Sequence, residues 1–209
     1  MPVPRRPSPD KVIDAAMRLA AERRWYEVTL REIADAAGIG LGDLHAMFAS
    51  KSAIIGAFTT RIDAQVIAGT DADALGEPAR DRLFDVLVRR LEALRPHRSA
   101  LGSIMCDAVM APEAGLAAGC RLMRSMTWSL ESTGIGASGR LGRLRTRGLA
   151  AIYLATLLVF LRDDSPDLAR TMAYLDRALG RADALMSRLK PFGGRRHRPS
   201  ELAAEGPAA

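Results

Sequence analysis

The chain has 209 residues, of which 48% are hydrophobic, 26% charged and 5% aromatic. This length can bury a substantial core in one or two domains, and 18 glycines and 11 prolines exclude a collagen-like or wholly disordered chain. The most apolar run, residues 149–161, is shorter than the roughly 20 residues that a membrane span needs. Residues 1–10 lack the apolar stretch of a signal peptide, so we expect a cytoplasmic protein.

The net charge of +6 is spread unevenly along the chain. Residues 1–65 carry nine basic and eight acidic side chains, so most of the positive excess lies beyond them. A nucleic-acid-binding surface in this first part would therefore depend on the arrangement of its cations and not on their number. The arginines of the central region are spaced as on the solvated surfaces of helices.

Apolar residues recur at helical spacing along almost the whole chain, and no segment alternates apolar and polar residues as a strand does. We therefore expect an all-α fold, interrupted at segments that contain glycine or proline. The tail, residues 191–209, has no apolar stripe and is expected to be disordered. The expected helices cover residues 8–23, 29–37, 39–48, 50–68, 79–95, 97–110, 112–133, 140–163 and 166–189.

Several of these helices have recognisable start signals. Thr29 and Glu32 have the spacing of a capping box, in which each side chain hydrogen-bonds the backbone amide of the other residue. Ser50 is placed to cap the next long helix, and Gly38 predicts a tight turn between the two short helices. Residues 165–167, Ser-Pro-Asp, predict a helix with serine as its cap and proline at its first position.

No pattern in the sequence has the context or spacing that a cofactor site, a metal site or a catalytic site requires. The run GIGASG at residues 134–139 fits the dinucleotide fingerprint, but a helix and not a strand precedes it. The three histidines and two cysteines match no metal-ligand spacing, and two cysteines are too few for a disulfide framework. Neither a nucleophile elbow nor a paired-carboxylate arrangement is present. We therefore expect no cofactor and no enzymatic activity.

Residues 12–58 combine a long helix, a capped short helix, a glycine turn and a second short helix, which is the order of a helix-turn-helix unit. They resemble the DNA-binding domain of the tetracycline-repressor (TetR) family in the segments VIDAAMRLAAERRW, VTLREIADAAGIG and LHAMFASKSAII. The resemblance implies a flexible arm over residues 1–8 and a three-helix DNA-binding domain over residues 9–50. A larger helical domain for ligand binding and dimerisation would follow over residues 51–190.

The resemblance also implies which residues meet a double-stranded DNA operator. The second short helix would enter the major groove, Thr29 would donate to a phosphate, and Lys51 would pair with the DNA backbone. Apart from the resemblance, Arg5 and Arg6 could reach the minor groove as a flexible arm, or could belong to a disordered, solubilising start. The candidate DNA-binding residues are Arg5, Arg6, Thr29, Gly40, Leu41, Gly42, Asp43, His45 and Lys51.

The expected recognition helix departs from the usual composition of such helices. No lysine or arginine lies between Gly38 and Ser50, although base readout normally uses arginine, lysine, asparagine or glutamine. Asp43 could accept a hydrogen bond from a cytosine amino group, and Leu41 could contact a thymine methyl group. The Asp43 carboxylate would also repel phosphate. This composition leaves a second function open beside DNA binding.

That second function comes from residues 147–179, RGLAAIYLATLLVFLRDDSPDLARTMAYLDRAL. They resemble the lipid-binding proteins of coenzyme-Q biosynthesis, which share the TetR-like fold and have lost DNA binding. The sequence thus predicts a TetR-like repressor released by a small apolar effector, and alternatively a lipid- or isoprenoid-binding protein. Because residues 191–209 lack the stripe of a membrane-docking helix, we expect no stable membrane insertion.

Flexible thioethers and aromatic rings on the central helices could line a cavity for the apolar effector or lipid. Their helical spacing fits an ordinary core equally well, so both interpretations remain open. The candidate ligand-binding residues are Met105, Met110, Met123, Met126, Trp128 and Tyr153.

Two further expectations concern local geometry and assembly. Arg24 stands where the family commonly has a helix-ending glycine, so we expect it in the left-handed backbone region. We also expect a homodimer whose interface is formed by helices 140–163 and 166–189. The apolar residues expected to supply that interface are Leu149, Ile152, Leu157, Val159 and Phe160.

Overall fold

The computed structural model describes residues 8–69, 76–110 and 112–189, and leaves the side chains of residues 109–114 and 189 undescribed. In these ranges every regular element is a helix, which confirms the all-α fold. None of the helices in them is long and apolar enough to cross a membrane. The elements are α1 (Pro9–Glu22), η1 (Trp25–Glu27), α2 (Leu30–Ala37), α3 (Leu41–Met47), α4 (Lys51–Ala68), α5 (Ala79–Leu94), η3 (Arg95–His97), α6 (Arg98–Met110), α7 (Pro112–Ser132), α8 (Gly139–Phe160) and α9 (Ala169–Leu189).

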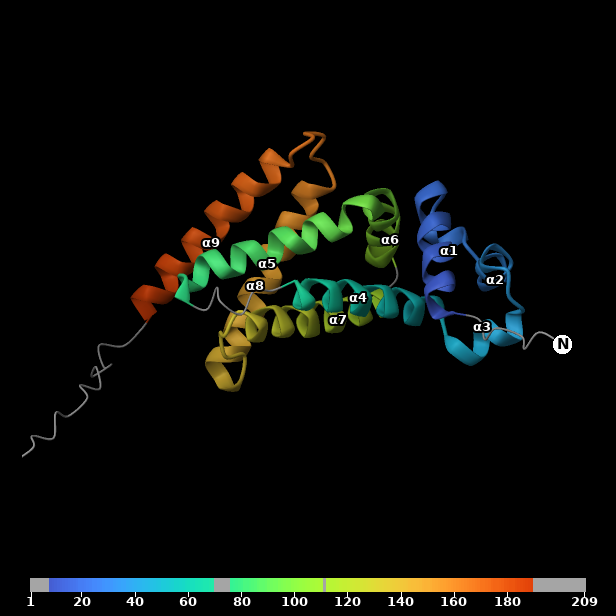
Figure 1. The fold of residues 1–209 in the computed structure, drawn as a ribbon, viewed down its shortest axis with the longest axis horizontal. Coiled ribbons are helices and arrows are strands. Elements are labelled where there is room, and N and C mark those ends of the chain that lie inside the picture. Colours follow the sequence, from blue (N-terminus) through green and yellow to red (C-terminus); the bar gives the residue numbers. More distant parts are fainter. Residues whose placement is uncertain (1–7, 70–75, 111, 190–209) are drawn as a thin grey trace, which may run out of the picture.

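The helices fall into a small N-terminal group and a larger body (Figure 1). α1, α2 and α3 lie together at one end, while α8 and α9 pack on each other towards the opposite end. α4 begins at the small group and runs through the body beside α7, with α5 packed on it as well. α1 packs against α6, so the N-terminal group is joined to the body both by the chain at α4 and by side-chain packing.

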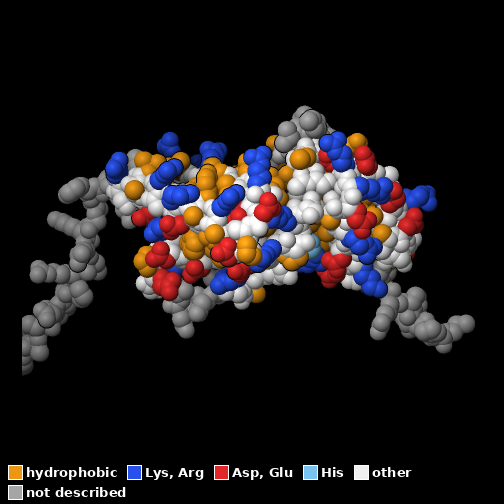
Figure 2. Space-filling model, turned by 90° about the horizontal axis from the view of Figure 1, so that it is seen from above, with side chains coloured by type: hydrophobic (Ala, Val, Ile, Leu, Met, Phe, Trp, Pro, Cys, Tyr) orange, Lys and Arg blue, Asp and Glu red, His pale blue; other side chains and the backbone are white. Residues whose placement is uncertain are grey.

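On the face of the molecule that Figure 2 shows, no large region carries charge of one sign. Figure 2 shows arginine and lysine side chains interspersed with acidic ones, and hydrophobic side chains between them on the half that holds α9. This agrees with the near balance of acids and bases in the first 65 residues.

The start signals of the short helices are confirmed. The Thr29 hydroxyl accepts a hydrogen bond from the Glu32 amide at 3.2 Å, and the Glu32 carboxylate accepts one from the Thr29 amide at 2.8 Å. The Ser50 hydroxyl accepts from the Ala53 amide at the start of α4. Gly38 lies in the left-handed region at φ 69°, which glycine adopts without the steric cost of a Cβ, and the chain can turn from α2 towards α3.

The expected left-handed conformation of Arg24 is wrong. Arg24 has φ −62° and ψ 130°, which is extended backbone, and Arg23 before it is extended as well. α1 ends because these two residues leave the helix in succession, and Arg24 then starts the 3-10 turn η1 by accepting a hydrogen bond from the Glu27 amide. The chain therefore needs no glycine-like residue at this position.

The expected start of the last helix is also wrong, because α9 begins at Ala169 and not at Pro166. Asp163, which is 1% exposed, accepts hydrogen bonds from the amide and hydroxyl of Thr171 at 2.8 and 2.7 Å, and further ones from Ser165. Burial alone would raise the pKa of Asp163, but these hydrogen bonds hold it well below its usual range. The chain between Asp163 and Thr171 turns around this carboxylate, and Leu168 takes a left-handed conformation at φ 55°.

The residues expected to form a dimer interface lie in the protein's own core. Leu149, Leu157 and Phe160 are buried within the single chain, and Ile152 and Val159 are half-buried. Because α8 packs against both α7 and α9, its most apolar side chains are buried inside the subunit. The large apolar residues that α8 leaves exposed are instead Leu141, Leu144, Leu154 and Leu158.

The burial of Phe160 predicts that its substitution lowers the stability of the protein more than a substitution at an exposed apolar residue does. Phe160→Ala removes a ring that is 0% exposed and should lower the free energy of unfolding by about 3–5 kcal/mol, because it leaves a cavity in packed surroundings. Leu116→Ala is the control, since this α7 side chain is 73% exposed and should change the free energy by less than about 0.5 kcal/mol. Urea denaturation followed by circular dichroism measures both, and equal small losses would contradict the assignment of Phe160 to the core.

Candidate functional site

The outward face of α3 consists of the residues expected to meet DNA. Leu44 is 1% exposed and anchors the helix to the N-terminal core. The expected contact residues on the other side of the helix are all exposed, namely Gly40, Leu41, Gly42, Asp43 and His45. A helix anchored on one side and open on the other is the geometry that major-groove reading requires, and the DNA contacts themselves remain predictions. Arg5 and Arg6 lie outside the described residues.

Thr29 has partners inside the protein that occupy its hydroxyl. Its proton is directed at the Glu32 carboxylate, 2.8 Å away, while its oxygen accepts from the Glu32 amide. The Arg23 guanidinium lies 2.7 Å from Glu32 and, together with the bonds from Thr29, lowers the pKa of Glu32 to about 2. A phosphate would have to displace Glu32 to receive the Thr29 proton. Arg31, exposed in the first turn of α2, is a nearby cation that sequence reasoning did not single out.

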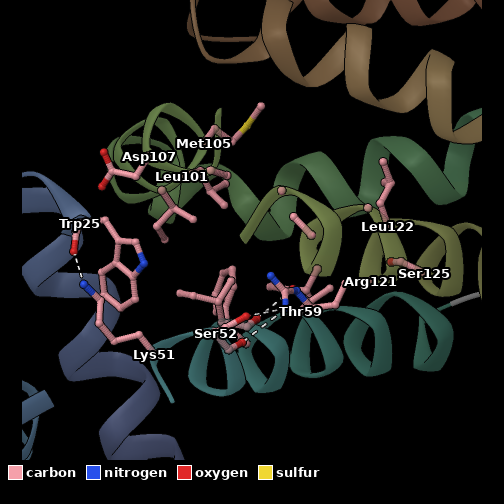
Figure 3. Close-up of a pocket in the computed structure, with 18 of the residues that line it drawn as sticks. Trp25, Lys51, Ser52, Thr59, Leu101, Met105, Asp107, Arg121, Leu122 and Ser125 are labelled. Atoms are coloured by element: carbon pink, nitrogen blue, oxygen red, sulfur yellow. Dashed lines mark hydrogen bonds between the residues drawn. The ribbon is translucent and has the colours of Figure 1, made fainter. Parts of the chain in front are cut away.

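Lys51 turns its side chain into the protein. Its ammonium donates to the backbone carbonyls of Trp25 and Val28 at 2.5 and 2.6 Å, and it lies 4.4 Å from the centre of the Trp25 ring (Figure 3). Partial removal from water lowers the pKa of Lys51, and the negative charge of nearby Asp107 opposes that shift. The resemblance implies that Lys51 pairs with the DNA backbone, whereas the structure engages its ammonium on two carbonyls. We refer to this arrangement as the Lys51 clamp.

The segment held by the Lys51 clamp is also bonded to α6. The Trp25 amide donates to the Ser103 hydroxyl at 2.8 Å, and that hydroxyl donates to the Arg23 carbonyl at 3.1 Å. The Tyr26 amide donates to the Asp107 carboxylate at 2.5 Å. The turn η1 therefore connects the helix-turn-helix unit to α6 through these hydrogen bonds.

A cavity of about 840 Å³ opens beside the Lys51 clamp. Its volume falls in the range of small-molecule sites. Its wall comes from η1 and from helices α4, α5, α6, α7 and α8, and Figure 3 shows Trp25, Lys51, Leu101 and Arg121 around it. Most of the wall is apolar, with Phe58, Ile62, Leu94, Leu101, Leu122 and Leu157 among the lining residues.

The cavity contains only part of the expected ligand-binding set. Met105 and Tyr153 line it. Met126 is instead fully buried in the core, Met123 packs half-buried against that core, and Trp128 lies 54% exposed on the surface. The spacing of these residues fitted a helix face, but it could not show which face of α7 turns to the cavity. The side chain of Met110 lies outside the description.

A buried polar cluster closes one part of the cavity wall. The Arg90 guanidinium, in a residue that is 3% exposed, donates to the Asp63 carboxylate, and the Ser125 hydroxyl donates to the same oxygen. Arg90 also lies 5.6 Å from the centre of the Tyr153 ring, and burial raises the pKa of Tyr153 despite this cation. Arg90 is thus a cation of the cavity wall that already has an acid partner.

Two family models match parts of the chain. The model described as "Bacterial regulatory proteins, tetR family" matches residues 12–58, which contain the helix-turn-helix unit and the Lys51 clamp. The model described as COQ9 matches residues 145–186, which run from α8 into α9. A search of the curated proteins finds no match.

Solved structures extend the likeness over most of the chain. The TetR transcriptional regulator of Nitrosomonas europaea is 25% identical at a TM-score of 0.70, over 84% of this chain and 98% of that one. The chain thus carries a TetR-type helix-turn-helix over residues 12–58 and has the fold of TetR transcriptional regulators over most of its length. A TetR regulator of Rhodococcus sp. RHA1 has the same fold at 21% identity and a TM-score of 0.60, over 87% of this chain and 96% of that one. FadR of Bacillus subtilis, solved in complex with stearoyl-CoA, also has this fold. It is 17% identical at a TM-score of 0.53, over 82% of this chain and 98% of that one.

These matches confirm two expectations from the sequence. An N-terminal helix-turn-helix is present, and the proteins that the chain matches are described as transcriptional regulators and not as enzymes. The COQ9 match also confirms that the second resemblance lies in the C-terminal half.

The Lys51 clamp predicts a specific loss of stability. Lys51→Met keeps much of the apolar stem but leaves the Trp25 and Val28 carbonyls without their donor, and it should lower the free energy of unfolding by about 1–3 kcal/mol. Lys11→Met on the exposed side of α1 is the matched control and should change it by less than about 0.5 kcal/mol. Urea titration of both variants measures the difference, and a Lys51→Met protein as stable as the control would show that the clamp contributes nothing.

Proposed function

We propose that the regulator is a repressor that binds its operator as a homodimer and releases it when an apolar effector fills the cavity. In this proposal residues 9–50 form the DNA-binding domain and residues 51–190 the effector-binding and dimerisation domain. The observation that carries it is that Trp25 and Lys51 line the cavity and at the same time hold the helix-turn-helix unit in place. An effector that binds these residues more tightly in one position of α3 than in another would shift α3 towards that position, which is what ligand control requires.

The apolar cavity wall supports an effector with a large apolar part. Burial of such a ligand against Phe58, Leu101 and Leu122 removes apolar surface from water. FadR, which has the same fold, was solved with stearoyl-CoA, and the COQ9 match in α8 and α9 is in agreement with a lipid-like ligand.

The exposed residues of α8 support a homodimer. Leu141, Leu144 and Leu158 are 49%, 52% and 48% exposed, and Gly148 and Ala151 between them are exposed and small. These positions follow each other at steps of three, four and seven residues, so they form one stripe along α8. We propose that this stripe packs against a second subunit in place of the buried residues expected from the sequence.

A charge on this stripe should therefore separate the subunits. Leu158→Glu buries an unpaired carboxylate in the proposed interface and should turn a dimer into a monomer at micromolar concentration, with the helix content kept. Leu116→Glu places the same change on exposed α7 and should leave the dimer intact. Sedimentation velocity measures both, and a Leu158→Glu protein that stays dimeric would move the interface away from this stripe.

The DNA-binding part of the proposal predicts sequence preference from α3. Fluorescence anisotropy compares the DNA upstream of the regulator's own gene with a scrambled duplex at several salt concentrations. The wild type should prefer the first, and His45→Ala or Asp43→Asn should reduce this preference by a factor that corresponds to about 1–3 kcal/mol for each base that is no longer read. Asp35→Asn, exposed on α2, is the control and should keep the preference.

The same titration decides between the regulator and a carrier without DNA binding. The observation that favours the carrier is the absence of lysine and arginine from residues 39–49, together with the COQ9 match. Equal, weak binding to both duplexes, unchanged by Asp43→Asn and His45→Ala, would overturn the repressor and leave a lipid or isoprenoid carrier.

A further inference from the structure

Three cations line the described part of the cavity, and two of them are already compensated. Lys51 is bonded to two carbonyls and lies near the Asp107 carboxylate. Arg90 is paired with Asp63, and Ser125 completes that cluster. The third cation, Arg121, differs from both.

Arg121 has no acidic partner within 4 Å among the described residues. Its guanidinium donates to the Ser52 hydroxyl at 3.0 Å and reaches the Ser52 carbonyl only at 3.5 Å (Figure 3). Partial burial lowers the pKa of Arg121, and the neighbouring cation Arg124 lowers it further. A half-buried guanidinium with a second cation beside it is unfavourable unless an anion joins it.

The position of Arg121 shows where such an anion would lie. Arg121 lines both the apolar cavity and an adjoining surface groove that contains Ser52, Thr59 and Arg124. Asp63, the acid that also borders this groove, accepts from Arg90 and Ser125. The guanidinium thus stands at the mouth of the cavity, between an apolar interior and the solvent.

We propose that the effector is an amphipathic anion, whose apolar chain fills the cavity and whose oxyanion head group binds Arg121 and the Ser52 hydroxyl at the mouth. This deepens the proposed function and rests on its effector cavity. A carboxylate matches the planar fork of a guanidinium with two parallel hydrogen bonds. A phosphate-bearing head group offers the same oxygen chemistry and reaches Arg124 as well, so the test includes one ligand of each kind.

The two tryptophans give a direct reporter for this test. Trp25 lines the cavity, whereas Trp128 is exposed on the surface. Trp128→Phe therefore leaves Trp25 as the sole tryptophan, and its emission follows ligand entry. This protein is titrated with dodecanoate, lauroyl-CoA and the neutral dodecanol, each below its micelle concentration.

Dodecanoate should bind at least tenfold more tightly than dodecanol. Arg121→Gln should remove this preference by weakening dodecanoate and leaving dodecanol unchanged, and Arg124→Gln should keep it. A loss with Arg124→Gln that is confined to lauroyl-CoA would identify phosphate as the head group. Since Arg121 lacks an acid partner, Arg121→Gln should also melt no lower than the parent protein.

The negative outcomes separate this inference from the proposed function. Dodecanol that binds the parent protein as tightly as dodecanoate overturns the anion site and keeps the apolar cavity. This comparison needs no substitution at Arg121, so it stands whatever the stability of that variant. A parent protein that binds none of the three ligands overturns the anion site and the effector cavity together.

Discussion

The hydrogen bonds of one ammonium group hold the helix-turn-helix unit in position on the rest of the molecule. Lys51 is the first residue of α4 and follows α3 by a short loop, while the carbonyls it binds belong to Trp25 and Val28, before α2. The ammonium therefore closes a ring of chain that contains α2 and α3. A hydrogen bond from a charged donor to a carbonyl is stronger than one from a neutral donor. The Trp25 indole ring beside the ammonium adds a cation–π attraction.

The Lys51 clamp borders the cavity. The clamp and the bonds from η1 to Ser103 and Asp107 hold η1 against the space that α4, α5, α6, α7 and α8 surround, and that space is the cavity. Its wall thus includes residues that hold the helix-turn-helix unit, and the effector that we propose would contact them. The mouth at Arg121 lies on α7, across the cavity from Trp25, so a bound amphipathic anion would reach from the clamp to the surface groove.

The sequence predicted the features that depend on neighbouring residues. The caps at Thr29 and Ser50 and the turn at Gly38 involve partners within a few positions, so local spacing was sufficient. The predicted start of α9 was wrong, although its signal was also local. The hydrogen bonds from Thr171 to the Asp163 carboxylate fix the chain before Ala169, so the helix does not begin at Pro166.

The contacts on which the proposals rest join residues that lie far apart in the chain. Lys51 binds carbonyls 23 and 26 positions away, and Arg121 binds Ser52 across 69 positions, so no local pattern indicates either. The methionines of α7 could not be assigned for the same reason. Their helical spacing showed that they share a face, but not whether that face points to the core or to the cavity. The exposed stripe of α8 was not predicted, because the interface was assigned to the most hydrophobic residues of this helix. Those residues are buried or half-buried within the subunit.

We propose that the Lys51 clamp transmits occupancy of the cavity to the helix-turn-helix unit. The direct test is the affinity for upstream DNA with and without saturating dodecanoate, measured by anisotropy for the wild type and for Lys51→Met. Dodecanoate should weaken DNA binding of the wild type by a factor of about 5–150, the range typical of allosteric coupling. In Lys51→Met both ligands should still bind, and the factor should fall towards one. An equal factor in the two proteins would show that the Lys51 clamp does not transmit occupancy of the cavity.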